Sequence, residues 1–278
     1  MRDAADYYAR SPHYRGERLM RFDDFAAEPQ MRGEVVILGR NGHYHHYDLD
    51  HIRLLREKGK LPAGADTTLV LYDWHEDLDH DPNGTELGNG TWGYVGLTGG
   101  SYANMYVLGV NPRGYSELNP SVFEDDEIRA PTEETMKLLD RVYLYPLAPS
   151  YYCLKFFPEC ESYLAANESV DRYFPVPEGG FVQVRFRAMN EATYQQRKGS
   201  VIVSIDLDVL RVSEMKADCP QGAASVDHLL GALDALSETG RVGACLICGL
   251  TESPDLHTEQ SFESLARILA RCSQMLER

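Results

Sequence analysis

The 278-residue chain has few cysteines, an excess of acidic over basic residues, and no long apolar run. Six cysteines are too sparse for a disulfide framework in a chain of this length. The net charge of −16 argues against a nucleic-acid or anionic membrane partner, since both attract basic surfaces. No stretch approaches the ~18 apolar residues of a membrane span, and the first residues have no apolar signal core. We therefore expect a cytoplasmic protein that binds neither nucleic acid nor membrane; a homo-oligomer stays open.

The sequence does contain apolar runs that alternate with amphipathic segments. The predicted strands are residues 35–39, 67–72, 105–110, 181–186, 201–203 and 242–250. The predicted helices are residues 48–58, 226–236 and 262–276, and a further helix is predicted to begin at Pro131. Strands that are apolar on both faces and alternate with helices predict an α/β fold: a mostly parallel sheet covered by helices on both sides. We expect a single domain over residues 1–278, with residues 1–30 as an N-terminal extension.

Two short runs concentrate chemically active side chains directly after apolar strands. Asp73, His75 and Asp77 follow the strand at 67–72, and Asp206 and Asp208 follow the run at 201–203. Alternate residues of an extended segment point to the same side, so each run should converge beside the sheet. Carboxylates gathered there would repel one another and lose hydration unless cations neutralise them. The pattern therefore predicts a metal site, with two ions.

Other candidate ligands are weighed against simpler roles. At least one of His43, His45 and His46, which follow the first predicted strand, is expected to point into the site. Cys245 and Cys248 have a spacing seen in zinc and redox sites, but they lie within an apolar run and are predicted to be core thiols. Asp79, His80 and Asp81, which continue the charged run after Asp77, are predicted to be solvated.

The two acidic runs, in this order, resemble the motifs of the arginase/agmatinase (ureohydrolase) superfamily, and the resemblance extends from about Val35 to Asp255. It implies an arginase-like three-layer α-β-α sandwich, with residues 111–200 as a divergent insert region, and a centre of two Mn²⁺ ions. The implied metal ligands are His45, Asp73, His75, Asp77, Asp206 and Asp208, with His46 as the alternative to His45. Asn89 would contact the substrate and Glu252 would hold the guanidinium group. Asp77 could also accept a proton from the nucleophilic water.

The sequence departs from typical members at two points, and Ile205-Asp206-Leu207-Asp208 with Ser253-Pro254 after the last predicted strand resembles a divergent branch that includes peptide arginases. Asp208 leads into Val209 where typical members have Asp-Pro, and Thr91-Trp92-Gly93 occupies the stretch of a mobile histidine. The implied reaction is hydrolysis of a guanidino group to an amine and urea. Its substrate would be a small guanidino compound or an arginine within a peptide, which would become ornithine. Two alternatives stay open: a metal-dependent amide deacetylase of the same fold, which keeps one metal, and a metal-retaining inactive binding protein.

Overall fold

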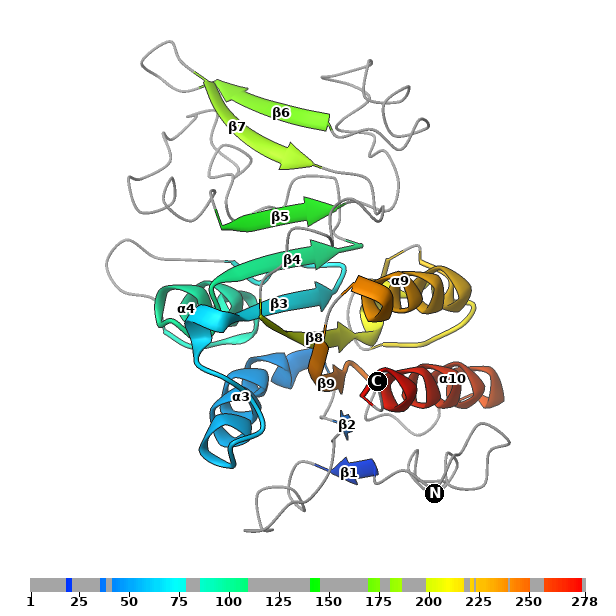
Figure 1. Cartoon of the computed structure of the whole chain (residues 1–278). Coiled ribbons are helices and arrows are strands. Elements are labelled where there is room, and N and C mark those ends of the chain that lie inside the picture. Colours follow the sequence, from blue (N-terminus) through cyan, green and yellow to red (C-terminus); the bar gives the residue numbers. More distant parts are fainter. Residues whose placement is uncertain are drawn as a thin grey trace.

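A sheet of nine described strands forms the centre of the computed structural model (Figure 1). The structure describes residues 19–21, 36–38, 42–78, 86–109, 141–145, 170–175, 181–186, 199–217, 221–222, 224–239, 241–250 and 258–276. The strands are β1 (Leu19–Arg21), β2 (Val36–Leu38), β3 (Thr67–Tyr72), β4 (Asn104–Leu108), β5 (Val142–Tyr145), β6 (Val170–Pro175), β7 (Phe181–Phe186), β8 (Ser200–Asp206) and β9 (Arg241–Cys248). Their order is β1-β2-β9-β8-β3-β4-β5-β7-β6, and every neighbouring pair is parallel except β6 and β7.

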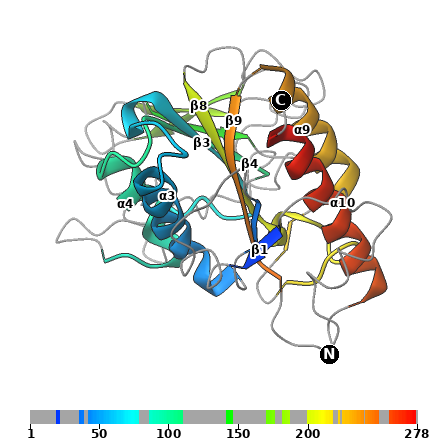
Figure 2. The same cartoon turned by 60° about the horizontal axis from the view of Figure 1, so that its bottom comes forward.

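Helices cover both faces of this sheet (Figure 2). The α-helices are α3 (Asp48–Glu57), α4 (Trp92–Thr98), α9 (Val226–Thr239) and α10 (Glu259–Leu276). Short 3-10 helices are η1 (Gly42–Tyr47), η2 (Gly64–Asp66), η3 (Asn89–Thr91) and η5 (Leu207–Val209). α3 and α4 lie on one face, and α9 and α10 lie on the other. The predicted α/β sandwich with a mostly parallel sheet is therefore confirmed.

The two central strands explain why the sheet needs both helical layers. All residues of β3 and β8 are buried. Alternate residues point to opposite faces, so Val70 and Val203 join the core under α9 and α10, whereas Leu69 and Ile202 join the core under α3 and α4.

The strand order reverses between β3 and β8. From β3 the chain continues to β4 on one side, and from β8 it continues to β9 on the other side. Open α/β sheets bind ligands where the strand order reverses in this way, outside the carboxyl ends of the strands. The acidic runs that follow β3 and β8 lie at this point.

Several predicted elements agree with the structure, and the structure also contains elements that were not predicted. The helix predicted over 48–58 is α3, after which Gly59 adopts φ +67°, a left-handed conformation that suits glycine. β1, β5, β6 and α4 were not predicted. The helix predicted from Pro131 lies outside the described residues, and the division at residues 1–30 and 111–200 stays a prediction. In the part of the chain that is described, no helix combines the length and apolarity needed to cross a membrane.

Candidate metal centre

The two acidic runs converge through tight turns and not through continued strands. β3 ends at Tyr72, and the backbone N–H of His75 donates to Asp73 Oδ1 at 2.7 Å. After β8 the chain enters η5, and the N–H of Asp208 donates to Asp206 Oδ1 at 3.1 Å. The prediction that each run stays extended was therefore wrong, because the leading carboxylate of each run folds the backbone back onto itself.

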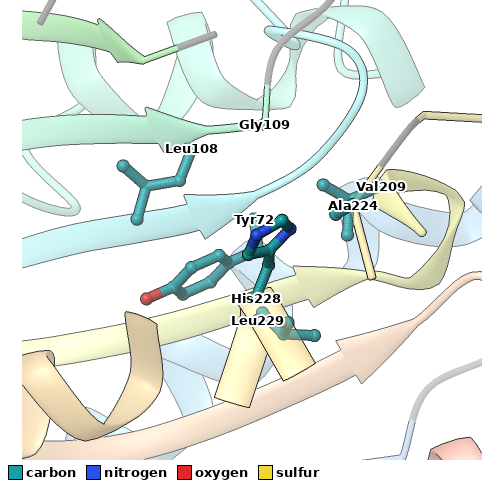
Figure 3. Close-up of a pocket in the computed structure, with 7 residues that line it drawn as sticks. All are labelled: Tyr72, Leu108, Gly109, Val209, Ala224, His228 and Leu229. Carbon is teal, nitrogen blue, oxygen red and sulfur yellow. The ribbon is translucent and has the colours of Figure 1, made fainter. Parts of the chain in front are cut away.

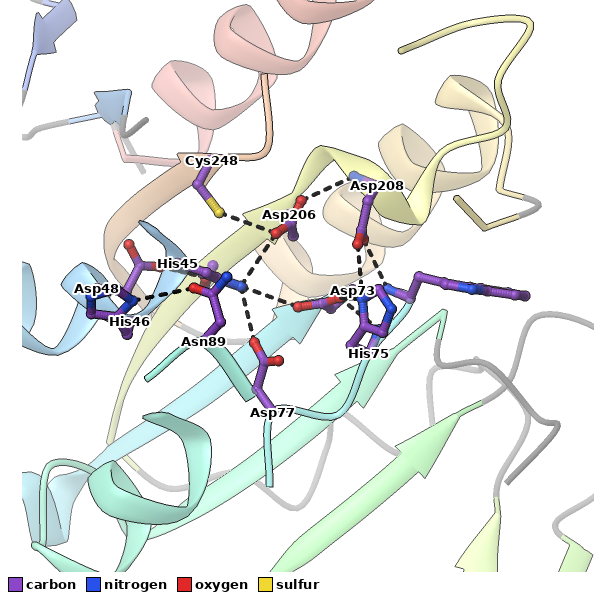
Figure 4. Close-up of polar contacts among 12 residues, drawn as sticks. His45, His46, Asp48, Asp73, His75, Asp77, Asn89, Asp206, Asp208 and Cys248 are labelled. Carbon is purple, nitrogen blue, oxygen red and sulfur yellow. Dashed lines mark hydrogen bonds and ion pairs between the residues drawn. The ribbon is translucent and has the colours of Figure 1, made fainter. Parts of the chain in front are cut away.

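One group of carboxylates surrounds the ring of His45 (Figure 4). His45 Nδ1 lies 3.1 Å from Asp77 Oδ2, 3.2 Å from Asp73 Oδ2 and 3.4 Å from Asp206 Oδ2. All four side chains are buried. One ring nitrogen carries at most one proton and cannot donate to three carboxylates at once. These separations are close to the ~3.3 Å between neighbouring ligand atoms that lie about 2.0 Å from a shared ion in tetrahedral geometry.

A second group lies beside the first and shares one residue with it. His75 Nδ1 is 2.9 Å from Asp208 Oδ2 and 3.6 Å from Asp73 Oδ1. Asp73 therefore directs one oxygen to each group. Asp206 is not shared in this way, because its described side-chain contacts with an imidazole involve only His45.

The structure distinguishes between the two candidate histidines of η1. His45 is 2% exposed and faces the carboxylates, whereas His46 Nδ1 lies 3.2 Å from Asn89 Oδ1. On the far side of the His45 ring, Nε2 lies 2.9 Å from Ser204 Oγ, and that hydroxyl donates to Asp48 Oδ2 at 2.6 Å. A hydrogen bond to the other ring nitrogen fixes the orientation of a metal-binding histidine. The geometry thus suits Nδ1 of His45 as a metal-binding atom.

Burial and mutual repulsion disfavour the ionised carboxylates. Burial raises the pKa of Asp73 to about 7, and the charges of Asp208 and Asp77 act in the same direction. Burial together with the charges of Asp208 and Asp73 also raises the pKa of Asp206 well above its usual range. Among the described residues, the ionic partners of Asp73, Asp77 and Asp206 are imidazoles, with no Lys or Arg.

The two imidazoles supply the positive charge that the carboxylates lack. Burial acts to lower the pKa of His75, but hydrogen bonds to Asp208 and Asp73 outweigh it and raise the pKa to about 11. Burial acts to lower the pKa of His45 too, whereas the nearby Cys248 sulfur and hydrogen bonds to carboxylates raise it well above its usual value. A divalent ion needs the ring nitrogens unprotonated, so it would replace these protons.

Several predicted positions cannot be placed in this arrangement. Glu252 and residues 79–81 lie outside the described residues. Asn89 is half-buried, and its contact with His46 brings it to the edge of the site.

The two cysteines of β9 lie in different surroundings. Cys245 lies in the core under α9 and α10, but Cys248 Sγ lies 3.5 Å from Asp206 Oδ2. The prediction of two core thiols is therefore correct for Cys245 and incomplete for Cys248.

Comparisons with known proteins identify the fold. No family model matches the chain, and no curated protein matches its sequence. Proclavaminate amidino hydrolase from Streptomyces clavuligerus aligns with a TM-score of 0.52 at 13% identity, covering 87% of this chain and 64% of that chain. Agmatine ureohydrolase of Thermoplasma volcanium aligns with a TM-score of 0.50 at 14% identity, covering 88% of this chain and 62% of that chain. The chain has the ureohydrolase fold. It spans less than two thirds of either solved chain.

Within this ureohydrolase fold, Trp92 is a site residue that the sequence analysis did not identify. Its Nε1–H donates to Asp77 Oδ2, and its ring centroid lies 4.7 Å from that of His45. Asp77 itself adopts φ +54°, and the N–H of Tyr94 binds its carbonyl at 3.2 Å. A side chain at Gly93 would meet the Asp77 carbonyl oxygen, so the start of α4 fits closely against this strained residue.

Replacing Trp92 by Phe should weaken metal binding, because the ring is retained while the hydrogen bond that orients Asp77 is lost. Losing a partner that orients a metal ligand typically costs ~10- to 100-fold in affinity. Calorimetric Mn²⁺ titration of Trp92→Phe measures this effect, and Trp74→Phe, which changes the other of the two tryptophans, is the control. Equal affinities for the two variants would contradict the role of Trp92.

The chain also contains a small cavity on the face of the sheet that α9 and α10 cover (Figure 3). It is lined by Tyr72, Leu108, Gly109, Val209, Ala224, His228 and Leu229. Its volume of about 10 Å³ is close to that of a single water-sized sphere. It contains none of the predicted metal ligands, so it is no candidate for a substrate site.

Proposed function

We propose that this chain is a binuclear manganese hydrolase that cleaves a guanidino group to an amine and urea. The proposed metal ligands are His45, Asp73, His75, Asp77, Asp206 and Asp208. The observation that carries the proposal is the position of Asp73, whose two oxygens face two different imidazoles. Two ligand groups that share a carboxylate form the arrangement expected of a two-ion centre.

The donor set suits manganese. Carboxylate oxygens and imidazole nitrogens are the ligands that Mn²⁺ accepts readily. The buried Asp73 Oδ2 has no hydrogen-bond partner, although it lies close to His45 Nδ1, so an ion there would satisfy an otherwise costly buried oxygen. When bound, a pair of divalent ions lowers the pKa of a water molecule and polarises the electrophilic carbon.

Side chains of the chain would carry out the proton transfer and bind the substrate. Hydrolysis forms a C–O bond at the guanidinium carbon and breaks one C–N bond, and a proton passes from the attacking water to the leaving nitrogen. Asp77 Oδ1 is the proposed acceptor of that proton, because hydrogen bonding from Trp92 holds the other oxygen of Asp77. Glu252 would bind the guanidinium through paired hydrogen bonds, and Asn89 would contact the rest of the substrate.

The substrate class is inferred from the fold and from the site. The two solved structures are named as an amidino hydrolase and a ureohydrolase, which supports a guanidino group as the reacting centre. Thr91-Trp92-Gly93 occupies the stretch where the resemblance would place a mobile histidine, and Trp92 packs on His45. We propose that the substrate is therefore bulky, with an arginine inside a peptide, converted to ornithine, preferred over free arginine.

Replacing Glu252 by Gln should cost about 2–4 kcal/mol of transition-state stabilisation, because a neutral amide binds a guanidinium poorly. Metal content should stay unchanged, since Glu252 is assigned to the substrate. Urea release by the Mn²⁺-loaded variant measures the effect, and Glu238→Gln at the exposed end of α9 is the matched control. Wild-type rates in Glu252→Gln would remove this residue from the proposal.

The reaction itself is tested by offering the Mn²⁺-loaded protein arginine, agmatine and arginine-containing peptides, and by measuring urea. The proposal expects urea from the peptides above all. Hydrolysis of an acetylated amine without any urea release would establish the deacetylase alternative. Binding of Mn²⁺ with no turnover of any compound would support the inactive binding protein.

A further inference from the structure

Cys248 is a buried thiol beside the metal centre that the proposed reaction does not use. It is the last residue of β9 and is 2% exposed. It is paired in register with Asp206 on the neighbouring strand β8. Figure 4 shows its sulfur directed toward the carboxylate of Asp206, on the side that faces His45.

The thiol of Cys248 donates a hydrogen bond to Asp206 Oδ2, and the distances around it also match those expected around a shared ion. One ligand atom from each of His45, Asp206 and Cys248 lies within 4.8 Å of the other two. The separation of Cys248 Sγ from Asp206 Oδ2 is 3.5 Å, and that of Asp206 Oδ2 from His45 Nδ1 is 3.4 Å. Metal–sulfur bonds of about 2.3 Å and metal–oxygen or metal–nitrogen bonds of about 2.0 Å set these separations near 3.5 Å and 3.3 Å where the angle at the metal is about 109°.

Two further observations direct these atoms toward a common point. Gly249 follows with φ +88°, and a Cβ there would lie 2.1 Å from Asp206 Oδ1, so glycine leaves room for this oxygen, which accepts from the N–H of Asp208. Asp73 Oδ2 is buried and without a hydrogen-bond partner, and it lies 3.2 Å from His45 Nδ1. An oxygen of this kind beside the cysteine group indicates a cation.

We infer that Cys248 is an additional ligand of the ion bound by His45, and that this ion site therefore prefers thiophilic divalent metals such as Zn²⁺ and Co²⁺ over Mn²⁺. Binding would form a metal–sulfur bond and release the thiol proton to solvent. The second group, with His75, Asp73 and Asp208, has only oxygen and nitrogen donors and keeps its preference for harder ions. This inference rests on the proposed function in that it assumes an ion between His45 and Asp206.

Cys245 provides a matched control in the same strand. Residues three apart in a strand point to opposite faces, so Cys245 points away from the site. It is fully buried, and its sulfur lies 4.0 Å from the carbonyl oxygen of Cys272 in α10. A serine at either position is nearly isosteric with cysteine, so both variants should fold.

The test is a Co²⁺ titration of the full chain followed by absorption spectroscopy. Bound Co²⁺ gives visible d–d bands with any ligand, and a Co²⁺–thiolate bond adds a near-ultraviolet charge-transfer band. The band is expected in the wild type and in Cys245→Ser, and it should be absent in Cys248→Ser. The affinity of Cys248→Ser for Zn²⁺ should fall ~10-fold or more, with little change in the affinity for Mn²⁺.

The outcomes separate this inference from the proposed function. Visible d–d bands without a charge-transfer band in the wild type would show that an ion binds without Cys248, which would overturn the inference and leave the metal centre standing. A charge-transfer band that persists in Cys248→Ser would assign the sulfur to another cysteine and would also overturn it. If no variant binds Co²⁺, Zn²⁺ or Mn²⁺, both the inference and the proposed metal centre fail.

Discussion

Replacing Asp73 by Asn is expected to remove both metal ions, whereas replacing Asp77 or Asp208 should remove one. Asp73 directs Oδ2 toward His45 and Oδ1 toward His75, so an amide there deprives both groups of a charged oxygen. Among the described imidazoles, Asp77 contacts that of His45 and Asp208 contacts that of His75. The isosteric amide keeps the packing while it removes the charge, so the loss should come from ligand chemistry.

Metal content per chain after dialysis, measured by mass spectrometry, checks this expectation. The values expected are two ions for the wild type, none for Asp73→Asn, and one for Asp77→Asn or Asp208→Asn. Asp234→Asn, in a half-exposed ion pair with Arg271, is the control and should retain two ions. Two ions retained in Asp73→Asn would show that this residue is not shared, and the two-ion proposal would lose its main support.

Much of the fold follows from sequence pattern because the buried strands have few alternatives. Thr67–Tyr72 and Val201–Val203 are apolar runs bounded by polar residues, and they are central strands buried on both faces. α4 was not predicted, since its seven residues include two glycines and present no extended apolar stripe. β6 pairs only with its antiparallel neighbour β7 at the edge of the sheet, and its polar residues resemble those of a loop.

The membership of the site was easier to predict than its geometry. Carboxylates directly after buried strands indicated Asp73 and Asp206, since both lie at the point where the strand order reverses. Alternation could not predict the turns that hydrogen bonds to these same carboxylates create. The placement of Cys248 could have been predicted, because it lies three positions along the strand from Cys245, which puts the two sulfurs on opposite faces. The contact between Trp92 and Asp77 depends on how α4 packs, which local sequence does not specify.

Removing the metal should lower the melting temperature of the loaded protein by about 5–10 °C. An ion at ~100 times its dissociation constant adds about 2.7 kcal/mol to the free energy of unfolding, and each kcal/mol shifts the melting temperature of a domain of this size by ~2–4 °C. Chelation followed by thermal unfolding measures the loss, and added Mn²⁺ should restore it. Asp206→Ala should weaken the response to Mn²⁺ without abolishing it, since this carboxylate contacts His45 in the first group and the second group keeps its own ligands. An unchanged melting curve after chelation of a fully loaded sample would count against the centre.

The difference in melting temperature between the Mn²⁺-loaded and the metal-free protein should increase as pH rises from 5 to 7. In the metal-free protein the pKa of Asp73 is raised to about 7 from the usual 3.8, so the folded chain binds this proton more tightly than the unfolded chain does. Stability from such a group is present at low pH and is lost as pH rises toward 7, at up to ~1.4 kcal/mol per pH unit for one proton.

The raised pKa of Asp206 acts in the same direction, whereas His75, with a pKa of about 11, keeps its proton across this range. Bound Mn²⁺ takes the place of these protons, so the free energy of unfolding of the loaded protein should fall much less between pH 5 and 7. Melting curves at pH 5, 6 and 7, with and without Mn²⁺, compare the two forms directly. A difference that stays constant or narrows with pH would mean that the ion does not replace protons on these carboxylates, and it would place the metal elsewhere in the chain.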